Sequence, residues 1–158
     1  MTAGRMMMLA AFGSATLLAG AYMFQAMGYA PCEMCLWQRW PHFAAIMAGG
    51  IAAALPVWPI GLFGGLSALA TAGIGGFHTG VERGWWPGPS ACSGDGGGLA
   101  GLSGADLLSV EGAGRVVMCD EVAWSFAGMS MASWNALLSL MLAILWLFAA
   151  WRAWRGRT

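Results

Sequence analysis

The sequence has very few charged residues and no lysine. Only 9% of its 158 residues are charged, as seven arginines and seven acidic residues, whereas an ordinary soluble domain is about 25% charged. Apolar residues make up 59% of the chain, and its mean hydropathy is +0.67. This composition excludes a soluble globular domain and a disordered chain. The lack of a basic surface also excludes a nucleic-acid-binding protein.

Charge is absent from three long stretches, and these locate the membrane spans. The uncharged runs cover residues 6–32, 40–81 and 122–151 and are 27, 42 and 30 residues long. One span needs about 20 apolar residues, so the middle run is long enough for two, and Pro56 and Pro59 divide it. The sequence predicts an all-α membrane protein of one domain, a four-transmembrane-helix bundle with spans at about 6–26, 41–55, 60–81 and 131–151.

The positions of the remaining charges predict the orientation of the bundle. Arg5 precedes the first span, and three further arginines follow the last. The long connection, residues 82–130, carries six acidic residues and two arginines, a net charge of −4. By the positive-inside rule, we expect both termini in the cytoplasm and two outward loops.

The first span is expected to remain in the mature protein. Its apolar core is longer than that of a secretory signal peptide. The one candidate cleavage point, after Ala30, would place Pro31 next in the chain. In the long connection, residues 94–98 are rich in glycine, which favours flexibility. Apolar residues further on predict a short amphipathic helix on the membrane surface: Leu107, Leu108, Val110, Val116 and Val117.

All four cysteines fall in the outward connections. Cys32 and Cys35 form a C-x-x-C motif, and Cys92 and Cys119 lie 27 residues apart in the long loop. A C-x-x-C loop is too short to restrain the chain much, so its spacing favours redox chemistry over a structural disulfide. A zinc site is the third interpretation in rank, because a four-cysteine zinc site usually uses two C-x-x-C pairs and the second pair here is widely spaced.

Three further side chains are candidates for the same site. Cys35 lies near the start of the second span, where a helix N-terminus lowers the pKa of a thiol. Arg39 would share its helix face if the helix extends back that far. Arg39 could then bind a carbonyl or an anion, or it could simply reach the lipid headgroups. His42 and His78 could donate hydrogen bonds at the membrane boundary or pack as structural residues.

Small residues within the spans fit close packing of helices. They carry no chemistry and are Gly49, Gly50, Gly64, Gly65, Gly73, Gly75 and Gly76.

The segment from Pro31 to Arg39, with the pattern Cys-x-x-Cys-x-x-Gln-Arg, resembles the signature of the DsbB family of membrane disulfide-bond formation proteins. The resemblance continues through Pro87–Cys92 and Cys119–Val122 and covers about residues 6–152. The family often has leucine where Met34 stands, a change that conserves side-chain volume.

This resemblance implies a protein-dithiol:quinone oxidoreductase in the bacterial inner membrane, with its cysteine loops in the periplasm. Cys92 and Cys119 would re-oxidise a periplasmic DsbA-type thioredoxin-fold partner, and we expect this pair to be mobile and exposed. Cys32 and Cys35 would pass the electrons to a quinone of the membrane pool, ubiquinone or menaquinone. Arg39 would lie against the quinone, and His42 and His78 are the other candidates for binding it.

Two alternatives remain at the level of sequence. Relatives of vitamin K epoxide reductase also place a C-x-x-C at a helix start, but late in the bundle rather than after the first span. The second alternative is a four-span structural or assembly protein whose outer loops are braced by disulfides. Thiol-dependent reduction of quinone would occur only in the enzymes.

Overall fold

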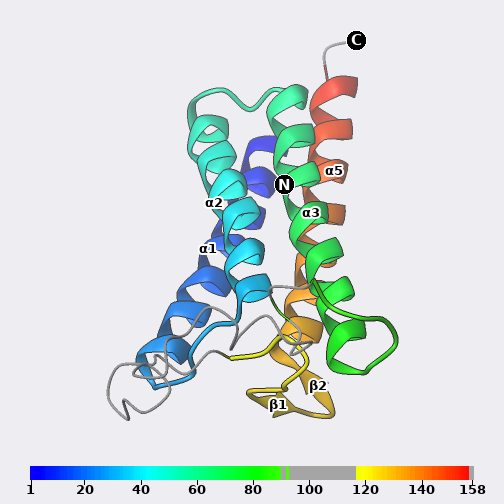
Figure 1. Ribbon diagram of the computed structural model, residues 1–158. Helices are drawn as coiled ribbons and strands as arrows, with labels where there is room; N and C mark the ends of the chain where they lie inside the picture. The colour runs from blue at the N-terminus through cyan, green and yellow to red at the C-terminus, as the bar shows by residue number, and fades with distance from the viewer. Residues whose placement is uncertain (90–91, 93–116, 157–158) are drawn as a thin grey trace, which may run out of the picture.

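The computed structural model describes residues 1–89, 92 and 117–156. In this part of the chain four helices form a bundle (Figure 1). The helices α1 and α3 lie diagonally opposite, and each packs against both α2 and α5. The bounds are α1 Ala3–Ala26, α2 Glu33–Ala54, α3 Trp58–Glu82 and α5 Met131–Arg155. Within these residues, α1, α3 and α5 are long and apolar enough to cross a membrane.

Local signals in the sequence account for the helix ends. The side chains of Thr2 and Ser130 cap α1 and α5 by accepting hydrogen bonds from main-chain N–H groups one turn later. The break predicted between the second and third helices lies at residues 55–57, where Pro56 prevents α2 from continuing. Pro59 is then accommodated in the first turn of α3, where its missing N–H costs nothing.

The expected start of the second helix, at residue 41, is wrong. The helix α2 begins at Glu33 and includes Pro41. The expected span began after Arg39, because the uncharged run starts at residue 40. The side chains of Gln38 and Arg39 are instead buried in the bundle. Because α2 starts early, the C-x-x-C motif lies at its N-terminus and Cys35 and Arg39 lie one turn apart.

A small β-hairpin precedes α5 and was not predicted. Strands β1 Ser125–Phe126 and β2 Met129–Ser130 pair antiparallel. The turn residues Ala127 and Gly128 have φ of 52° and 76°, as a two-residue turn between twisted strands requires. The predicted surface helix and the glycine-rich stretch fall largely outside the described residues.

The buried core fills the half of the bundle that lies nearer the termini. Its members are mainly alanine and methionine with one large side chain, Trp146. A methyl group built on Gly64 would lie 2.7 Å from the Trp146 ring. This half is therefore packed through small residues, as in membrane bundles generally.

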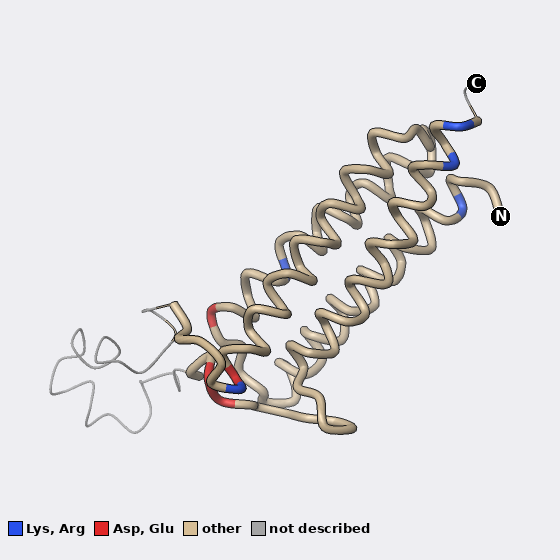
Figure 2. Tube along the Cα trace, turned by 90° about the vertical axis from the view of Figure 1, so that its right-hand side faces the viewer, with Lys and Arg blue, Asp and Glu red and all other residues tan. Residues whose placement is uncertain are grey.

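The two ends of the bundle differ in charge (Figure 2). Both termini lie at one end, with Arg5 and Arg152 nearby. Acidic residues collect at the opposite end, which contains the N-terminus of α2 and the C-terminus of α3. All four cysteines lie at this acidic end.

Candidate functional site

The C-x-x-C motif forms the first turn of α2. Cys32 is the N-cap residue, and its sulfur accepts a hydrogen bond from the main-chain N–H of Cys35 at 3.3 Å. Both cysteines are free thiols, and the Cys32 Sγ donates to the Cys35 Sγ at 2.8 Å. One sulfur is therefore placed to stabilise a negative charge on the other.

The two thiols have opposite pKa shifts. The hydrogen bond from Cys32 lowers the pKa of Cys35 below its ordinary value, and the positive charge of Arg39 acts in the same direction. The pKa of Cys32 is raised, first by that hydrogen bond and then by burial. A thiolate is the nucleophile in thiol–disulfide exchange, so Cys35 is the more reactive cysteine of the reduced pair.

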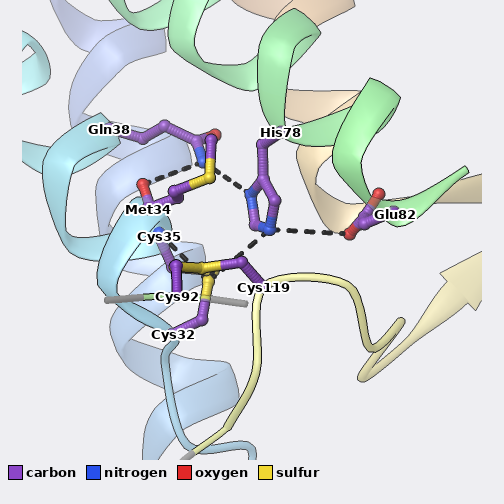
Figure 3. Close-up of a disulfide and its surroundings, with 8 residues drawn as sticks. All are labelled: Cys32, Met34, Cys35, Gln38, His78, Glu82, Cys92 and Cys119. Atoms are coloured by element: carbon purple, nitrogen blue, oxygen red, sulfur yellow. Dashed lines mark hydrogen bonds and ion pairs between the residues drawn. A yellow bond between two sulfur atoms is a disulfide. The ribbon is translucent and has the colours of Figure 1, made fainter. Parts of the chain in front are cut away.

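The second cysteine pair forms a disulfide beside the first pair (Figure 3). Cys92 and Cys119 are 2% and 0% exposed, so the expectation of an exposed pair is wrong. Both pack in one cluster with Cys32, Met34 and Val81. Cysteine sulfur behaves as a small apolar group that is favourably buried away from water. The end of the bundle that contains the C-x-x-C motif provides this buried position.

His78 joins the cysteines to the rest of the site (Figure 3). Its Nε2 lies 3.6 Å from the Cys32 Sγ and 4.0 Å from Glu82 Oε1. Its Nδ1 lies 3.1 Å from Gln38 Nε2. The ring therefore contacts a thiol, a carboxylate and an amide, rather than lipid headgroups.

Arg39 is buried between helices. It is 8% exposed, its Nη1 donates to Gln25 Oε1 at 2.8 Å, and its guanidinium stacks over Tyr22 at 4.5 Å. These contacts argue against a side chain that merely reaches the lipid headgroups. Its Nε is buried without a hydrogen-bond partner among the described residues, so one strong donor is available for a bound group.

A cavity of about 250 Å³ connects these side chains. Cys32, Cys35, Arg39, His42 and His78 all line it, whereas Cys92 and Cys119 do not. Apolar side chains from α1, such as Leu17 and Phe24, complete much of the wall. The cavity thus combines an apolar lining with a thiol pair and a buried cation, a combination typical of a small-molecule site.

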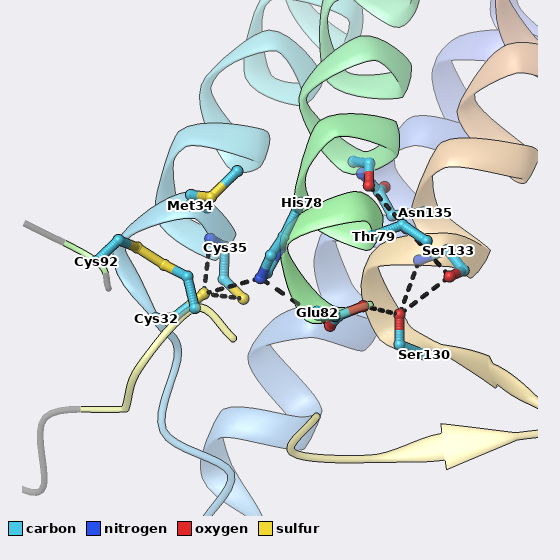
Figure 4. A network of polar contacts seen from close by, with 12 residues as sticks. Cys32, Met34, Cys35, His78, Thr79, Glu82, Cys92, Ser130, Ser133 and Asn135 are labelled. Carbon is cyan, nitrogen blue, oxygen red and sulfur yellow. Dashed lines mark hydrogen bonds and ion pairs between the residues drawn. A yellow bond between two sulfur atoms is a disulfide. The ribbon is translucent and has the colours of Figure 1, made fainter. Parts of the chain in front are cut away.

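A network of polar contacts extends from the cavity into the bundle (Figure 4). His42 Nε2 lies 2.9 Å from Asn135 Oδ1, and Asn135 Nδ2 lies 2.7 Å from Gln38 Oε1. Glu82 accepts a hydrogen bond from Ser130, which also contacts Ser133. Helices α2, α3 and α5 are therefore linked at the site by hydrogen bonds.

Sequence reasoning assigned no role to Asn135, Glu82, Gln25 or Tyr22. Signals existed for three of them. Asn135 and Gln25 are the only amides in the last and the first uncharged runs, and a polar residue within a span is usually functional. Glu82 follows the middle run, four residues after His78 and one helical turn away. Tyr22 gave no signal, because its contact with Arg39 depends on how α1 and α2 pack.

Metal ligation is compatible with the spacing of three donor atoms. The ligand atoms of Cys32, Cys35 and His78 all lie within 4.8 Å of one another. Two thiolates and an imidazole are ligands that zinc prefers. The imidazole can bind a metal ion only through a ring nitrogen that carries no proton.

Fold and site together define a helical membrane protein with a dithiol and a disulfide packed in one cluster. The family model described as disulfide bond formation protein DsbB matches residues 3–149. The disulfide bond formation protein B of Verminephrobacter eiseniae (strain EF01-2) is 33% identical over 164 residues, covering 98% of this chain and 90% of that protein. That of Acidovorax sp. (strain JS42) is 30% identical over 148 residues, covering 90% and 83%.

The chain therefore belongs to the DsbB family, as the sequence motifs predicted. It is a multi-pass membrane protein and an oxidoreductase that generates disulfides. A further relative from Polaromonas sp. (strain JS666 / ATCC BAA-500), also a disulfide bond formation protein B, is 28% identical and covers 97% of this chain and 94% of that protein. No solved structure matches the chain significantly.

Proposed function

We propose that this protein re-oxidises a periplasmic DsbA-type thioredoxin-fold dithiol and passes the electrons to a membrane quinone. The observation that carries the proposal is the clustering of both cysteine pairs at one end of the bundle, with Cys32 and Cys35 lining a cavity beside Arg39. A thiol pair in contact with both a second pair and an apolar cavity can pass electrons between them.

The electron path consists of thiol–disulfide exchanges. The dithiol of the partner attacks the Cys92–Cys119 disulfide, so the partner becomes oxidised and these two cysteines become thiols. Their thiols then reduce a Cys32–Cys35 disulfide, and Cys92 and Cys119 return to the disulfide seen here. Each exchange moves two electrons in two successive attacks: one thiolate forms a mixed disulfide, and the second thiolate of the same pair resolves it.

The size and the apolar lining of the cavity support the binding of a quinone headgroup. When bound, a quinone would supply an acceptor for the two electrons and two protons that Cys32 and Cys35 give up as they form a disulfide. The unpartnered Arg39 Nε and His42 Nδ1 are hydrogen-bond donors or acceptors in the wall. Arg39 would hold a carbonyl oxygen, and the apolar residues of α1 would hold the ring. The lowered pKa of Cys35 supplies a thiolate in the same wall.

The proposed orientation places the cysteine end in the periplasm of the bacterial inner membrane. What supports it is the arginines near both termini and the acidic residues at the other end (Figure 2). A C-terminal fusion to a reporter active only in the periplasm should be inactive. An active C-terminal fusion would reverse the orientation.

The decisive experiment uses purified protein, a reduced DsbA-type partner and a quinone. The wild-type protein should reduce quinone at a rate that depends on the partner's thiols. Cys32→Ser and Cys35→Ser should abolish this activity, whereas Leu36→Ser, which changes an exposed residue between them and Arg39, should keep it. Near wild-type turnover in either cysteine variant would refute the relay.

A further inference from the structure

The protonation of His78 decides what this ring can do for the neighbouring thiol. A neutral imidazole carries a proton on one nitrogen and a lone pair on the other. If the Nε2 carries the proton, the ring donates a hydrogen bond to Cys32. If the Nδ1 carries it, the Nε2 can accept a proton or bind a metal. Neighbouring groups fix the choice.

The orientation of the Gln38 amide is determined by a main-chain group. Its Nε2 lies 3.1 Å from the carbonyl oxygen of Met34, which can only accept. Turning the amide over would bring two acceptors together there. The amide NH₂ therefore faces both Met34 and His78, and it donates to the lone pair of His78 Nδ1.

Asn135 supports the same orientation from α5. Its Nδ2 donates to Gln38 Oε1 at 2.7 Å and to Thr71 Oγ1 at 3.0 Å. The Thr71 hydroxyl already donates to the main-chain carbonyl of Gln38 at 3.0 Å, so its oxygen is an acceptor for Asn135. The Asn135 Oδ1 accepts from His42 Nε2 and from Ser139. Every donor in this network thus faces an acceptor.

These assignments place the His78 proton on Nε2, which lies 3.6 Å from the Cys32 Sγ. Cys32 in turn donates to Cys35. The donors therefore point in one direction, from Asn135 to Gln38, His78, Cys32 and finally the sulfur of Cys35. In such a chain each hydrogen bond polarises the next.

We propose that Gln38 and Asn135 are positioning residues that lock His78 in its Nε2–H form, so that a directed hydrogen-bond chain ends on and stabilises the Cys35 thiolate. His78 then serves as a donor and not as the base that removes the Cys32 proton. An Nε2 that carries a proton has no lone pair for a metal ion, so this form of the ring opposes a zinc site with Cys32 and Cys35.

Other charges face the Cys35 sulfur and are taken into account in the test. The negative charge of Glu82 raises the pKa of Cys35, and the positive charge of Arg39 lowers it. Glu82 Oε1 lies 4.0 Å from the His78 Nε2, so its charge is close to the ring. Asn135→Asp adds a further negative charge, so the direction of the chain is judged from the ring signals and not from the reactivity of Cys35 alone.

The test reads the ring directly. The chain has only two histidines, so ¹⁵N-histidine labelling gives two sets of ring signals in micelles, assigned with His42→Gln. Reduced wild-type protein should show His78 protonated at Nε2 and unprotonated at Nδ1. The reverse pattern in the wild type would overturn the proposal, with no variant needed.

Two substitutions of Asn135 separate direction from mere packing. Asn135→Asp introduces a carboxyl group that can only accept once it is ionised, so the ring signals are recorded at a pH high enough to ionise it. Gln38 should then turn its NH₂ toward the carboxylate, because a charge-assisted hydrogen bond is stronger than the one to Met34. The His78 proton should then move to Nδ1. Asn135→Leu removes this donor but offers no acceptor that would turn the Gln38 amide over. The Gln38 NH₂ should therefore stay hydrogen-bonded to the Met34 carbonyl, and the His78 ring should keep its proton on Nε2. An Nε2–H ring in Asn135→Asp would overturn the proposal.

The reactivity of Cys35 provides the second measurement. With Cys92 and Cys119 replaced by serine, alkylation of Cys35 at neutral pH should be about tenfold slower in Asn135→Asp and within about threefold in Asn135→Leu. The role in turnover rests on the proposed function, but the ring signals do not. In the wild type, a His78 ring protonated at Nδ1 together with normal quinone reduction would refute only the hydrogen-bond chain. A ring protonated at Nε2 without quinone reduction would refute only the proposed function.

Discussion

At the residue scale, the site is a cysteine pair held between a buried cation and a buried histidine. The sequence predicted the four cysteines, Arg39, His42 and His78 as candidates, because their residue types and spacing are informative by themselves. It could not predict their partners. Gln25 and Asn135 come from other helices, and such contacts depend on three-dimensional packing. The burial of Cys92 was missed for the same reason.

Arg39→Ala should impair the quinone step and largely spare the partner step. Arg39 offers an unpartnered Nε to the cavity, and a hydrogen bond to a charged group contributes about 1.5–3 kcal/mol. The apparent quinone KM should rise, or the reduction rate should fall, by roughly tenfold to a hundredfold. Lysine should restore only part of the loss, because it lacks the planar guanidinium.

Arg83→Ala is the matched control for this experiment. Arg83 is exposed at the end of α3 and stacks on Trp85 instead of lining the cavity. The measurement is steady-state kinetics in which quinone and partner are varied separately. If Arg39→Ala weakened only the partner step, Arg39 would be a docking residue and the proposed quinone site would be misplaced.

The pH dependence of Cys35 should change when its hydrogen-bond donor is removed. A lowered pKa keeps Cys35 as a thiolate below the ordinary value of 9.0, and its reactivity is lost as the pH falls through the lowered pKa. In a background lacking Cys92 and Cys119, Cys32→Ala should shift the alkylation profile of Cys35 toward higher pH.

Cys32→Ser should shift the same profile less, because a hydroxyl still donates to the Cys35 sulfur. The rates should differ by about tenfold per unit of pKa shift when both variants are measured well below pH 9. Identical profiles for the alanine and serine variants would show that Cys32 acts on Cys35 by something other than donating a hydrogen bond.

At the element scale, uncharged runs predicted where the helices lie, and the proline pair predicted the turn between the second and third. The error at the start of α2 arose because the charge of Arg39 set the beginning of the uncharged run at residue 40. Length and hydropathy cannot show that Arg39 and Gln38 have hydrogen-bond partners inside the bundle, on α1 and α3. The predicted close packing of helices at the glycines holds at some positions and not at others. Gly49 and Gly64 lie at close contacts, whereas Gly50 and Gly73 face open space.

Gly49→Ala should destabilise the bundle, and Gly50→Ala is its neighbouring control. A methyl group at Gly49 would overlap the Cβ of Ala11, so α1 would have to move away from α2. Overpacking of this kind typically costs about 1–3 kcal/mol. A methyl group at Gly50 meets nothing within 4 Å, and alanine favours a helix over glycine.

Thermal unfolding in detergent provides the comparison between the two variants. The melting temperature should fall for Gly49→Ala and stay level or rise for Gly50→Ala. Equal melting temperatures for both would mean that α1 and α2 do not approach each other as closely as described.

At the scale of the whole molecule, the tightly packed core and the candidate functional site lie in different halves of the bundle. The half near the termini is a tight core of small residues around Trp146, while the opposite half holds the cavity, the cysteines and most buried polar groups. A bilayer penalises unpaired polar groups, so the network around Asn135 is satisfied almost entirely from within. Among the described residues, the buried polar atoms without a partner are Arg39 Nε and His42 Nδ1 in the cavity wall and Ser14 Oγ and Trp146 Nε1 outside it.

In the proposed relay, the second cysteine pair must exchange disulfides both with Cys32–Cys35 and with the soluble partner. In the described state Cys92 and Cys119 pack against Cys32, a position suited to internal exchange. Exchange with a soluble partner requires that the sulfur of Cys92 become accessible outside this cluster. From the family resemblance we expect Cys92 to form the mixed disulfide with the partner and Cys119 to resolve it. The two roles can be separated, because removing the resolving cysteine should leave a stable mixed disulfide.

Cys119→Ser should capture a single-cysteine partner whose thiol is activated as a mixed disulfide with thionitrobenzoate. The Cys92 thiolate attacks the partner sulfur, thionitrobenzoate leaves, and no neighbouring thiol in the loop resolves the product. Cys92→Ser is the matched control, which should capture far less. Non-reducing electrophoresis and the released chromophore measure the two products. Capture through Cys32 or Cys35 instead would reverse the roles of the two pairs, because the C-x-x-C pair would then be the one that exchanges with the soluble protein.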